Sequence, residues 1–272
     1  MRHETFDIKN SGSQDYAALH LYLLDDSKEI NIHKRPMIII CPGGGYHFTS
    51  DREAEIVALQ FAAMGYHAAV LRYSVAPAVF PAAILEVAKS VILIREHAAE
   101  WFVDPEKIAV LGFSAGGPLA ASYSLFWHQD WMAEKMGVEK EILRPNAMIL
   151  CYPVITSGEY AHKGSFMNLL GEDYETKKEE FSLENCVTEN APRAFIWHTY
   201  EDKSVPIQNS LFLVNALVQH DIPVEYHIFQ SGSHGLSLAN RLTGNVGHGP
   251  GGAASAWIGL VHQWIENWLA EE

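Results

Sequence analysis

The sequence has few cysteines and little positive charge, and both shortages narrow the classes of protein to which it can belong. It contains 3 cysteines in 272 residues, widely separated and with no Cys-x-x-Cys pair of the kind that binds zinc or exchanges disulfides. We therefore expect a reducing compartment. The 19 Lys and Arg residues against 33 Asp and Glu give a formal net charge of −14, which repels nucleic-acid phosphates and anionic lipid surfaces. No nucleic-acid partner is expected.

Long apolar runs are also missing. No stretch approaches the roughly 18 apolar residues needed to span a membrane, and residues 1–14 lack the basic start and apolar core of a signal peptide. The histidines show no paired ligand spacing such as His-Glu-x-x-His, so neither a metal nor another cofactor is expected. These absences predict a cytoplasmic protein that does not bind membranes. The sequence carries no indication of its oligomeric state.

Short apolar runs that resemble strands alternate with longer segments that resemble helices. Continuous apolar runs are typical of parallel strands buried on both faces, and they occur at residues 37–41, 68–73, 108–113, 147–152, 194–199 and 224–229. Residues 17–23 instead alternate, which predicts a strand with one buried face near a sheet edge. The pattern predicts a single α/β domain over residues 1–272, with a mostly parallel sheet covered by helices on both faces.

The helical segments follow prolines or carry apolar residues at helical spacing. Pro81 and Pro206 precede two of them, and residues 253–270 form a third, whose Trp257, Trp264 and Trp268 we expect to pack in the core. Residues 156–190 break the rhythm of strands and helices. We expect this segment to be an insertion that could form a small lid.

The sharpest chemical signal is Gly112, Ser114 and Gly116, a Gly-x-Ser-x-Gly motif between a predicted strand and a predicted helix. In that position the motif forms a nucleophile elbow, where the glycines make room for a strained turn that presents the serine hydroxyl above the sheet edge. The alternative is an ordinary glycine-rich turn with a buried serine. The strand-to-helix context favours Ser114 as a nucleophile.

A serine hydroxyl needs a base, and the base needs a carboxylate that fixes its tautomer. Asp202 lies just past the predicted strand at residues 194–199, with Glu201 as its rival, and an alternative role as a helix cap before Pro206. Of the 14 histidines, His234 is the best candidate base, because it follows the next predicted strand at the same sheet edge. His227 lies inside that strand and is expected to pack, while His248 lies in a glycine-rich loop for which we have no interpretation.

Acyl transfer also requires N–H donors directed at the oxygen that becomes negative in the transition state. Residues 42–46 read Pro-Gly-Gly-Gly-Tyr directly after the predicted strand at 37–41 and offer amides that no Cβ obstructs. A phosphate-binding loop is the alternative, but no Lys-Ser or Lys-Thr follows the glycines. The amide of Ala115, next after the serine, would complete the usual pair of donor sources.

Together, the glycine loop, the Gly112–Gly117 motif, Asp202 and His234 with Gly235 resemble the α/β-hydrolase superfamily, in particular its small esterase branch. Within that branch the chain is most similar to bacterial acetyl esterases that act on acetylated sugars or xylan. The resemblance implies an eight-stranded, mostly parallel sheet, with Ser114 as nucleophile, Asp202 as acid and His234 as base. It also implies an oxyanion site made by Gly44, Gly45 and Ala115. Lipase-type relatives carry His-Gly-Gly-Gly, whereas this chain has Pro42 before the glycines, which favours the sugar-esterase branch.

The sequence thus predicts a metal-independent carboxylesterase whose substrate is a small-molecule ester, above all an acetylated sugar. The same machinery would also serve a peptidase or an arylformamidase. A third interpretation is a non-catalytic binding module on a hydrolase scaffold, which the intact Ser114, Asp202 and His234 disfavour.

Overall fold

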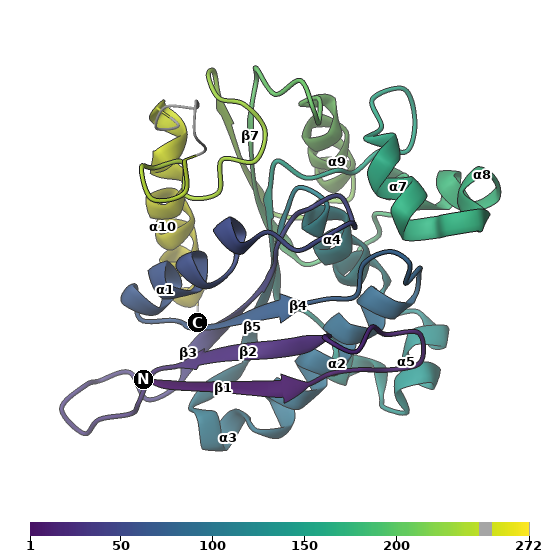
Figure 1. Cartoon of the computed structure of the whole chain (residues 1–272). Coiled ribbons are helices and arrows are strands. Elements are labelled where there is room, and N and C mark those ends of the chain that lie inside the picture. The colour runs from purple at the N-terminus through teal and green to yellow at the C-terminus, as the bar shows by residue number, and fades with distance from the viewer. Residues whose placement is uncertain (245–251, 272) are drawn as a thin grey trace.

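The structure, a computed structural model, describes residues 1–244 and 252–271 and is built around one eight-stranded sheet (Figure 1). The strand order is β1-β2-β4-β3-β5-β6-β7-β8. β2 is antiparallel to both of its neighbours, and every pair from β4 to β8 is parallel. The eight-stranded, mostly parallel sheet expected from the sequence is therefore confirmed. The strands are β1 (Arg2–Asp7), β2 (Ala18–Leu23), β3 (Arg35–Cys41), β4 (His67–Arg72), β5 (Val103–Phe113), β6 (Ala147–Cys151), β7 (Arg193–Thr199) and β8 (Val224–Phe229).

The burial of the strands follows their apolar patterns. All residues of β3 and β6 are buried, as expected for parallel strands with helices on both faces. In β2 the alternating Leu19, Leu21 and Leu23 are fully buried. The sequence did not predict β1, whose residues alternate between half-buried and exposed because it pairs only with β2 at the sheet edge. β5 begins at Val103, before the predicted run at 108–113, so Asp104 and Pro105 lie within the strand.

Helices cover both faces of the sheet. α2, α4 and α9 pack in the core on one face, and α1 and α10 pack in the core on the other. The expected packing role of the tryptophans of α10 is confirmed, since Trp257, Trp264 and Trp268 are all buried. The helices are α1 (Glu55–Ala63), α2 (Ala82–Glu96), α3 (Ala98–Trp101), α4 (Gly116–Phe126), α5 (Asp130–Met136), α6 (Lys140–Leu143), α7 (Lys163–Leu170), α8 (Tyr174–Lys177), α9 (Gln208–Gln219) and α10 (Trp257–Leu269). None of the described helices is long and apolar enough to cross a membrane.

The segment between β6 and β7 holds α7, α8 and several short 3-10 turns, and Figure 1 shows α7 and α8 projecting at one side of the molecule. Its attachment to the core is apolar. Phe181 is 5% exposed and meets Phe80 edge to face at a ring distance of 4.9 Å. The charged residues Lys177, Glu179 and Glu180 of this segment are exposed.

The strand order brings distant segments together at one edge of the sheet. After β3 the chain moves to one side to form β4 and then to the other side to form β5, so β3 and β5 are neighbours, with Cys41 opposite Gly112. Such a reversal leaves a crevice at the carboxyl ends of the strands, where ligands bind in open α/β sheets. The loop after β3 and the turn after β5 therefore meet there.

Candidate active site

Ser114 occupies a tight turn between β5 and α4. Its φ is 51°, in the left-handed region that non-glycine residues rarely adopt. The flanking glycines are required by close backbone contacts: a Cβ on Gly112 would lie 2.1 Å from the carbonyl oxygen of Gly116, and one on Gly116 would lie 2.1 Å from that of Cys41. The Ser114 amide donates to the carbonyl of Cys151 at 3.0 Å, which anchors the turn to β6.

Ser114, His234 and Asp202 lie in one hydrogen-bonded chain. Ser114 Oγ lies 2.6 Å from His234 Nε2, and His234 Nδ1 lies 2.6 Å from Asp202 Oδ2. With its proton on Nδ1, the imidazole donates to the carboxylate and accepts from the serine hydroxyl. The Asp202 side chain is fully buried and that of His234 is 20% exposed. The structure thus brings together three residues that the sequence analysis singled out from positions far apart in the chain.

The carboxylate of Asp202 is held in place by the loop that carries it. Oδ1 accepts the amides of Ser204 and Val205, each at 3.0 Å, so the capping role and the contact with His234 occur together on separate oxygens. Burial by itself raises the pKa of Asp202, but hydrogen bonds from His198 and His234 outweigh it and hold that pKa well below its usual range. Asp202 is therefore ionised at neutral pH. His198 is fully buried within β7 and lies 3.4 Å from Asp202 Oδ2, although nothing in the sequence marks it as part of this site.

The competing candidates lie elsewhere. Glu201 is exposed, and its Oε2 accepts a long hydrogen bond of 3.4 Å from the amide of Gly232. His227 lies in β8 and stacks on Phe229 at a ring distance of 6.4 Å. His248 lies outside the described residues.

The glycine loop after β3 lies directly against the nucleophile. A Cβ on Gly43 would be 2.8 Å from the Cβ of Ser114. The Gly43 amide donates to Glu53 Oε2 at 2.8 Å and so is not free for a ligand. Within the described part of the chain, the amides of Gly44, Gly45 and Ala115 have no hydrogen-bond acceptor. They are the donors that could serve an oxyanion. Gly44 has a φ of 134° and Gly45 a φ of 65°, conformations that favour glycine.

The insertion contacts the same loop. Asn168 Nδ2 of α7 donates to the carbonyl oxygen of Gly45 at 2.8 Å. At the start of α7, His162 Nδ1 lies 2.8 Å from Ser165 Oγ, and burial lowers the pKa of His162. The sequence offers no motif that marks His162 as part of this site.

Two open hollows are lined by residues that follow or contact the glycine loop, but neither lining includes the glycines themselves or the hydrogen-bonded Ser-His-Asp chain. The first, of about 440 Å³, includes His47 and Phe48, which closely follow the glycines, together with Tyr16 and Arg72. The second, of about 530 Å³, includes Asn168 and the exposed side chain of Met167. In the described residues no group of His, Cys, Asp and Glu side chains is arranged to hold a metal ion.

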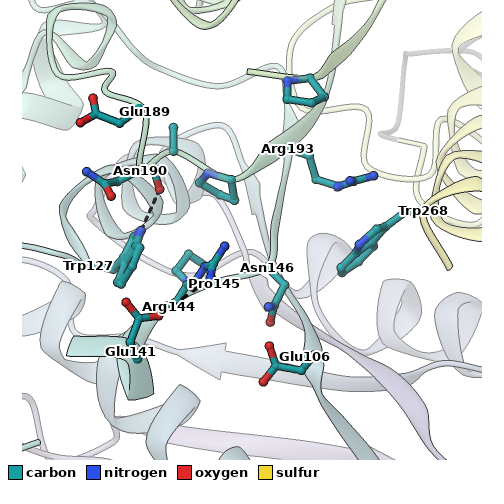
Figure 2. A pocket seen from close by; sticks show the side chains of 13 residues that line it. Glu106, Trp127, Glu141, Arg144, Pro145, Asn146, Glu189, Asn190, Arg193 and Trp268 are labelled. Carbon is teal, nitrogen blue, oxygen red and sulfur yellow. Dashed lines mark hydrogen bonds and ion pairs between the residues drawn. The ribbon is translucent and has the colours of Figure 1, made fainter. Parts of the chain in front are cut away.

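A separate cavity of about 440 Å³ lies at the amino-terminal ends of the parallel strands (Figure 2). Asn146 and Arg193 line it where β6 and β7 begin, whereas Ser114 follows the end of β5. Trp127 and Trp268 line it as well but are only 5% and 6% exposed. The chain of Ser114, His234 and Asp202 is not part of this cavity.

Comparisons with known proteins point to one family. A family model described as BD-FAE matches residues 20–217. The chain is 36% identical over 213 residues to Endo-1,4-beta-xylanase B of Butyrivibrio fibrisolvens and 29% identical over 208 residues to Acetylxylan esterase of Xylanibacter ruminicola. These matches cover 76% and 74% of this chain. The chain spans about a third to two fifths of the length of these curated relatives, since the matches cover 33% and 41% of them.

Solved structures with the same fold extend over nearly the whole chain. The acetyl ester-xyloside bifunctional hydrolase from Caldicellulosiruptor lactoaceticus is 37% identical, with a TM-score of 0.80 over 92% of this chain and 88% of that one. The carboxylesterase Cest-2923 from Lactobacillus plantarum WCFS1 is 29% identical, with a TM-score of 0.84 over 98% of both chains.

Proposed function

Because the chain belongs to the BD-FAE family, in the esterase branch of the α/β-hydrolases, we propose that it is a serine carboxylesterase that removes small acyl groups from carbohydrate esters. The observation that carries the proposal is the hydrogen-bonded chain from Ser114 through His234 to Asp202, beside free backbone donors. Acyl transfer needs these two features together, a nucleophile with an oriented base and a site for the developing oxyanion.

The reaction begins with attack by Ser114. As Oγ approaches the ester carbonyl carbon, the hydroxyl proton moves to His234 Nε2, 2.6 Å away. The imidazolium that forms is stabilised by the ionised carboxylate of Asp202. The carbonyl oxygen becomes negative and accepts hydrogen bonds from the amides of Ala115, Gly44 and Gly45.

Two stages follow the formation of this tetrahedral intermediate. The bond to the alcohol breaks, and His234 gives its proton to the leaving oxygen, so that the acyl group remains on Ser114. A water molecule attacks this acyl-serine and passes a proton to His234. The carboxylic acid leaves, and Ser114 recovers its proton from the imidazole.

The substrate class rests on the relatives. Two relatives are named for xylan or acetylxylan, and one similar structure is that of an acetyl ester-xyloside hydrolase. We therefore place acetyl first among the acyl groups and an acetylated sugar first among the substrates. The hollows beside the glycine loop, lined in part by Tyr16 and Phe48 in one and by Met167 in the other, would receive the sugar. The segment at residues 156–190 would act as a cover attached at Asn168.

The test compares the wild-type protein with Ser114→Ala. Wild-type protein should release acetate from acetylated xylo-oligosaccharides faster than it releases longer acids from octanoyl esters. The variant should lose at least about 1,000-fold in turnover with its fold preserved, and a fluorophosphonate should label only the wild type. Equal activity of the variant would refute the assignment. Hydrolysis of aminoacyl amides or formamides in preference to acetyl esters would indicate a peptidase or an arylformamidase, and a failure of Ser114 to label would indicate a binding module.

A further inference from the structure

A buried carboxylate lies behind the glycine loop without taking part in the mechanism above. Glu53 follows that loop in the chain and is only 3% exposed. Its Oε2 accepts the Gly43 amide at 2.8 Å, and its Oε1 accepts the hydroxyl of Tyr152 at 2.6 Å. The Tyr152 oxygen in turn accepts the amide of Ser237 at 2.8 Å. We call these four residues the Glu53 network.

The charge of Glu53 makes this arrangement demanding. Burying a carboxylate is costly unless its oxygens receive hydrogen bonds. No Lys or Arg pairs with Glu53 among the residues that the structure describes, so its hydrogen-bond donors are a loop amide and a tyrosine hydroxyl. Burial, together with the charge of Glu53, raises the pKa of Tyr152 well above its usual value, so the phenol keeps its proton and remains a donor.

Each end of the Glu53 network is attached to a different part of the candidate active site. Gly43 directly precedes Gly44 and Gly45, so its bond to Glu53 fixes the peptide plane that leads into the two free amides. At the other end, Ser237 lies three residues after His234 in the same loop. The ring of Tyr152 also packs edge to face against the His234 imidazole, with ring centres 5.1 Å apart.

The residue next to Glu53 strengthens the attachment of the histidine loop. The Arg52 backbone carbonyl accepts the hydroxyl of Ser237, and its Nη1 donates to the carbonyl of Thr243 at 2.8 Å. Trp257 Nε1 donates to the Ser237 carbonyl at 2.9 Å, so Ser237 is held from several sides. Since all these contacts are buried or half-buried, a shift of the glycine loop is coupled to a shift of the loop that bears His234.

We propose that Glu53 and Tyr152 are positioning residues that fix the position of the oxyanion donors relative to His234. This rests on the proposed function. The oxyanion amides and the base act on the same tetrahedral intermediate, and a misplacement of about 1 Å can cost about 100-fold in rate. The Glu53 network joins the two loops through three hydrogen bonds, and the Tyr152 ring also contacts the His234 imidazole.

The test measures the transition state separately from substrate binding. Glu53→Gln keeps the size of the side chain. The neutral amide has one oxygen instead of two, so it cannot replace both hydrogen bonds that Glu53 accepts from Gly43 and Tyr152. We expect kcat to fall by about 10- to 100-fold with KM changed by less than about twofold. Binding of a trifluoromethyl ketone, which forms the tetrahedral adduct, should weaken by a similar factor. Tyr152→Phe should lower kcat by about tenfold, and the double variant should lower kcat by less than the product of the two single effects.

Glu55→Gln is the matched control. Glu55 is exposed two residues further along and accepts a tyrosine hydroxyl too, that of Tyr22 at 3.1 Å, but away from Ser114. This variant should retain wild-type kcat and affinity for the ketone. Circular dichroism and thermal unfolding identify any loss of folded protein.

The rate of Ser114 labelling by a fluorophosphonate gives a readout that needs no ester substrate, because phosphonylation also places charge on an oxygen beside these amides. Labelling should be slower in Glu53→Gln even if the wild type failed to hydrolyse acetyl esters. That failure would refute the proposed function but not the positioning role of Glu53. Wild-type kcat and labelling rate in folded Glu53→Gln, or an effect confined to KM, would overturn the inference. A protein whose Ser114 never labels would overturn both proposals.

Discussion

Asn168 of α7 donates from Nδ2 to the carbonyl oxygen of Gly45 at 2.8 Å, so the insertion and the glycine loop are joined at a residue whose own amide has no acceptor in the described part of the chain. Of the contacts described here, this hydrogen bond is the one by which the proposed cover could influence catalysis directly. It leads to a prediction that separates the role of Asn168 from that of the rest of the insertion.

Asn168→Ala should lower kcat/KM for acetyl esters by about three- to tenfold, because the loss of one hydrogen bond leaves the Gly45 peptide less well fixed. Steady-state kinetics on a chromogenic acetyl ester measure the effect. Glu179→Ala, at an exposed position of the same insertion, is the control and should match the wild type. If both variants retain wild-type kinetics, α7 does not position the loop.

Asp202→Asn should lower kcat by about 10,000-fold, since an amide no longer holds the proton on Nδ1 of His234. The fold should persist because the side-chain oxygen of Asn can still accept the amides of Ser204 and Val205. Glu201→Gln, the neighbouring acid, should stay within about twofold of the wild type because its side chain is exposed. The opposite ranking of these two variants would assign the acid to Glu201.

His67 predicts an acid-sensitive step in stability that is independent of the active site. It is fully buried in β4, where Nδ1 accepts the amide of Leu24 and Nε2 donates to the carbonyl of Phe102, each at 3.1 Å. Burial lowers the pKa of His67 to about 4, from its usual value of 6.5. Between these two pH values the unfolded chain binds a proton that the folded protein does not, so stability falls as the pH drops from about 6.5 to 4.

Urea unfolding at pH 7 and pH 4.5 tests this. His67→Gln has no proton to gain there, so its free energy of unfolding should fall by about 2 to 3 kcal/mol less than that of the wild type over the interval. Equal losses in the two proteins would show that His67 does not contribute to the acid sensitivity.

Gly259→Ala should stabilise the protein by about 0.5 to 1 kcal/mol, because alanine restricts the unfolded chain more than glycine and favours helix. Gly259 lies on the exposed side of α10, and a Cβ there would meet nothing within 4 Å. Thermal unfolding measures the gain. Gly44→Ala is the contrasting substitution, since its Cβ would lie 2.0 Å from the carbonyl oxygen of Phe48, and it should abolish activity.

The sequence predicted those parts of the molecule that follow from local pattern. The parallel strands are continuous apolar runs. Ser114 lies in a short motif whose glycines avoid clashes with the nearby backbone, so both features can be identified from the sequence. His234 could be chosen because it follows a strand, and parallel strands end at one edge of the sheet. Asp202 follows a strand too, but so does Glu201, and the resemblance to the α/β-hydrolases decided between them. The roles of these three residues remain predictions until variants are measured.

The remaining features depend on contacts between distant segments. β1 is a polar edge strand with no buried face, so its sequence lacks an apolar alternation. Glu53 would be expected at the surface, because charged residues are rarely buried, and only the folded chain shows the loop amide and the tyrosine that receive it. The sequence likewise does not distinguish His198 from the other histidines, because its contact with Asp202 is formed only in the folded chain.

The glycines around Ser114 have a consequence for attempts to change acyl preference. Gly112 and Gly116 press against main-chain carbonyls, so no smaller neighbouring side chain could relieve a substitution at either position. Redesign must therefore leave the turn intact and work at its periphery. Phe48 and Met167 are exposed in the two adjoining hollows and could be exchanged there without disturbing the backbone that presents the nucleophile.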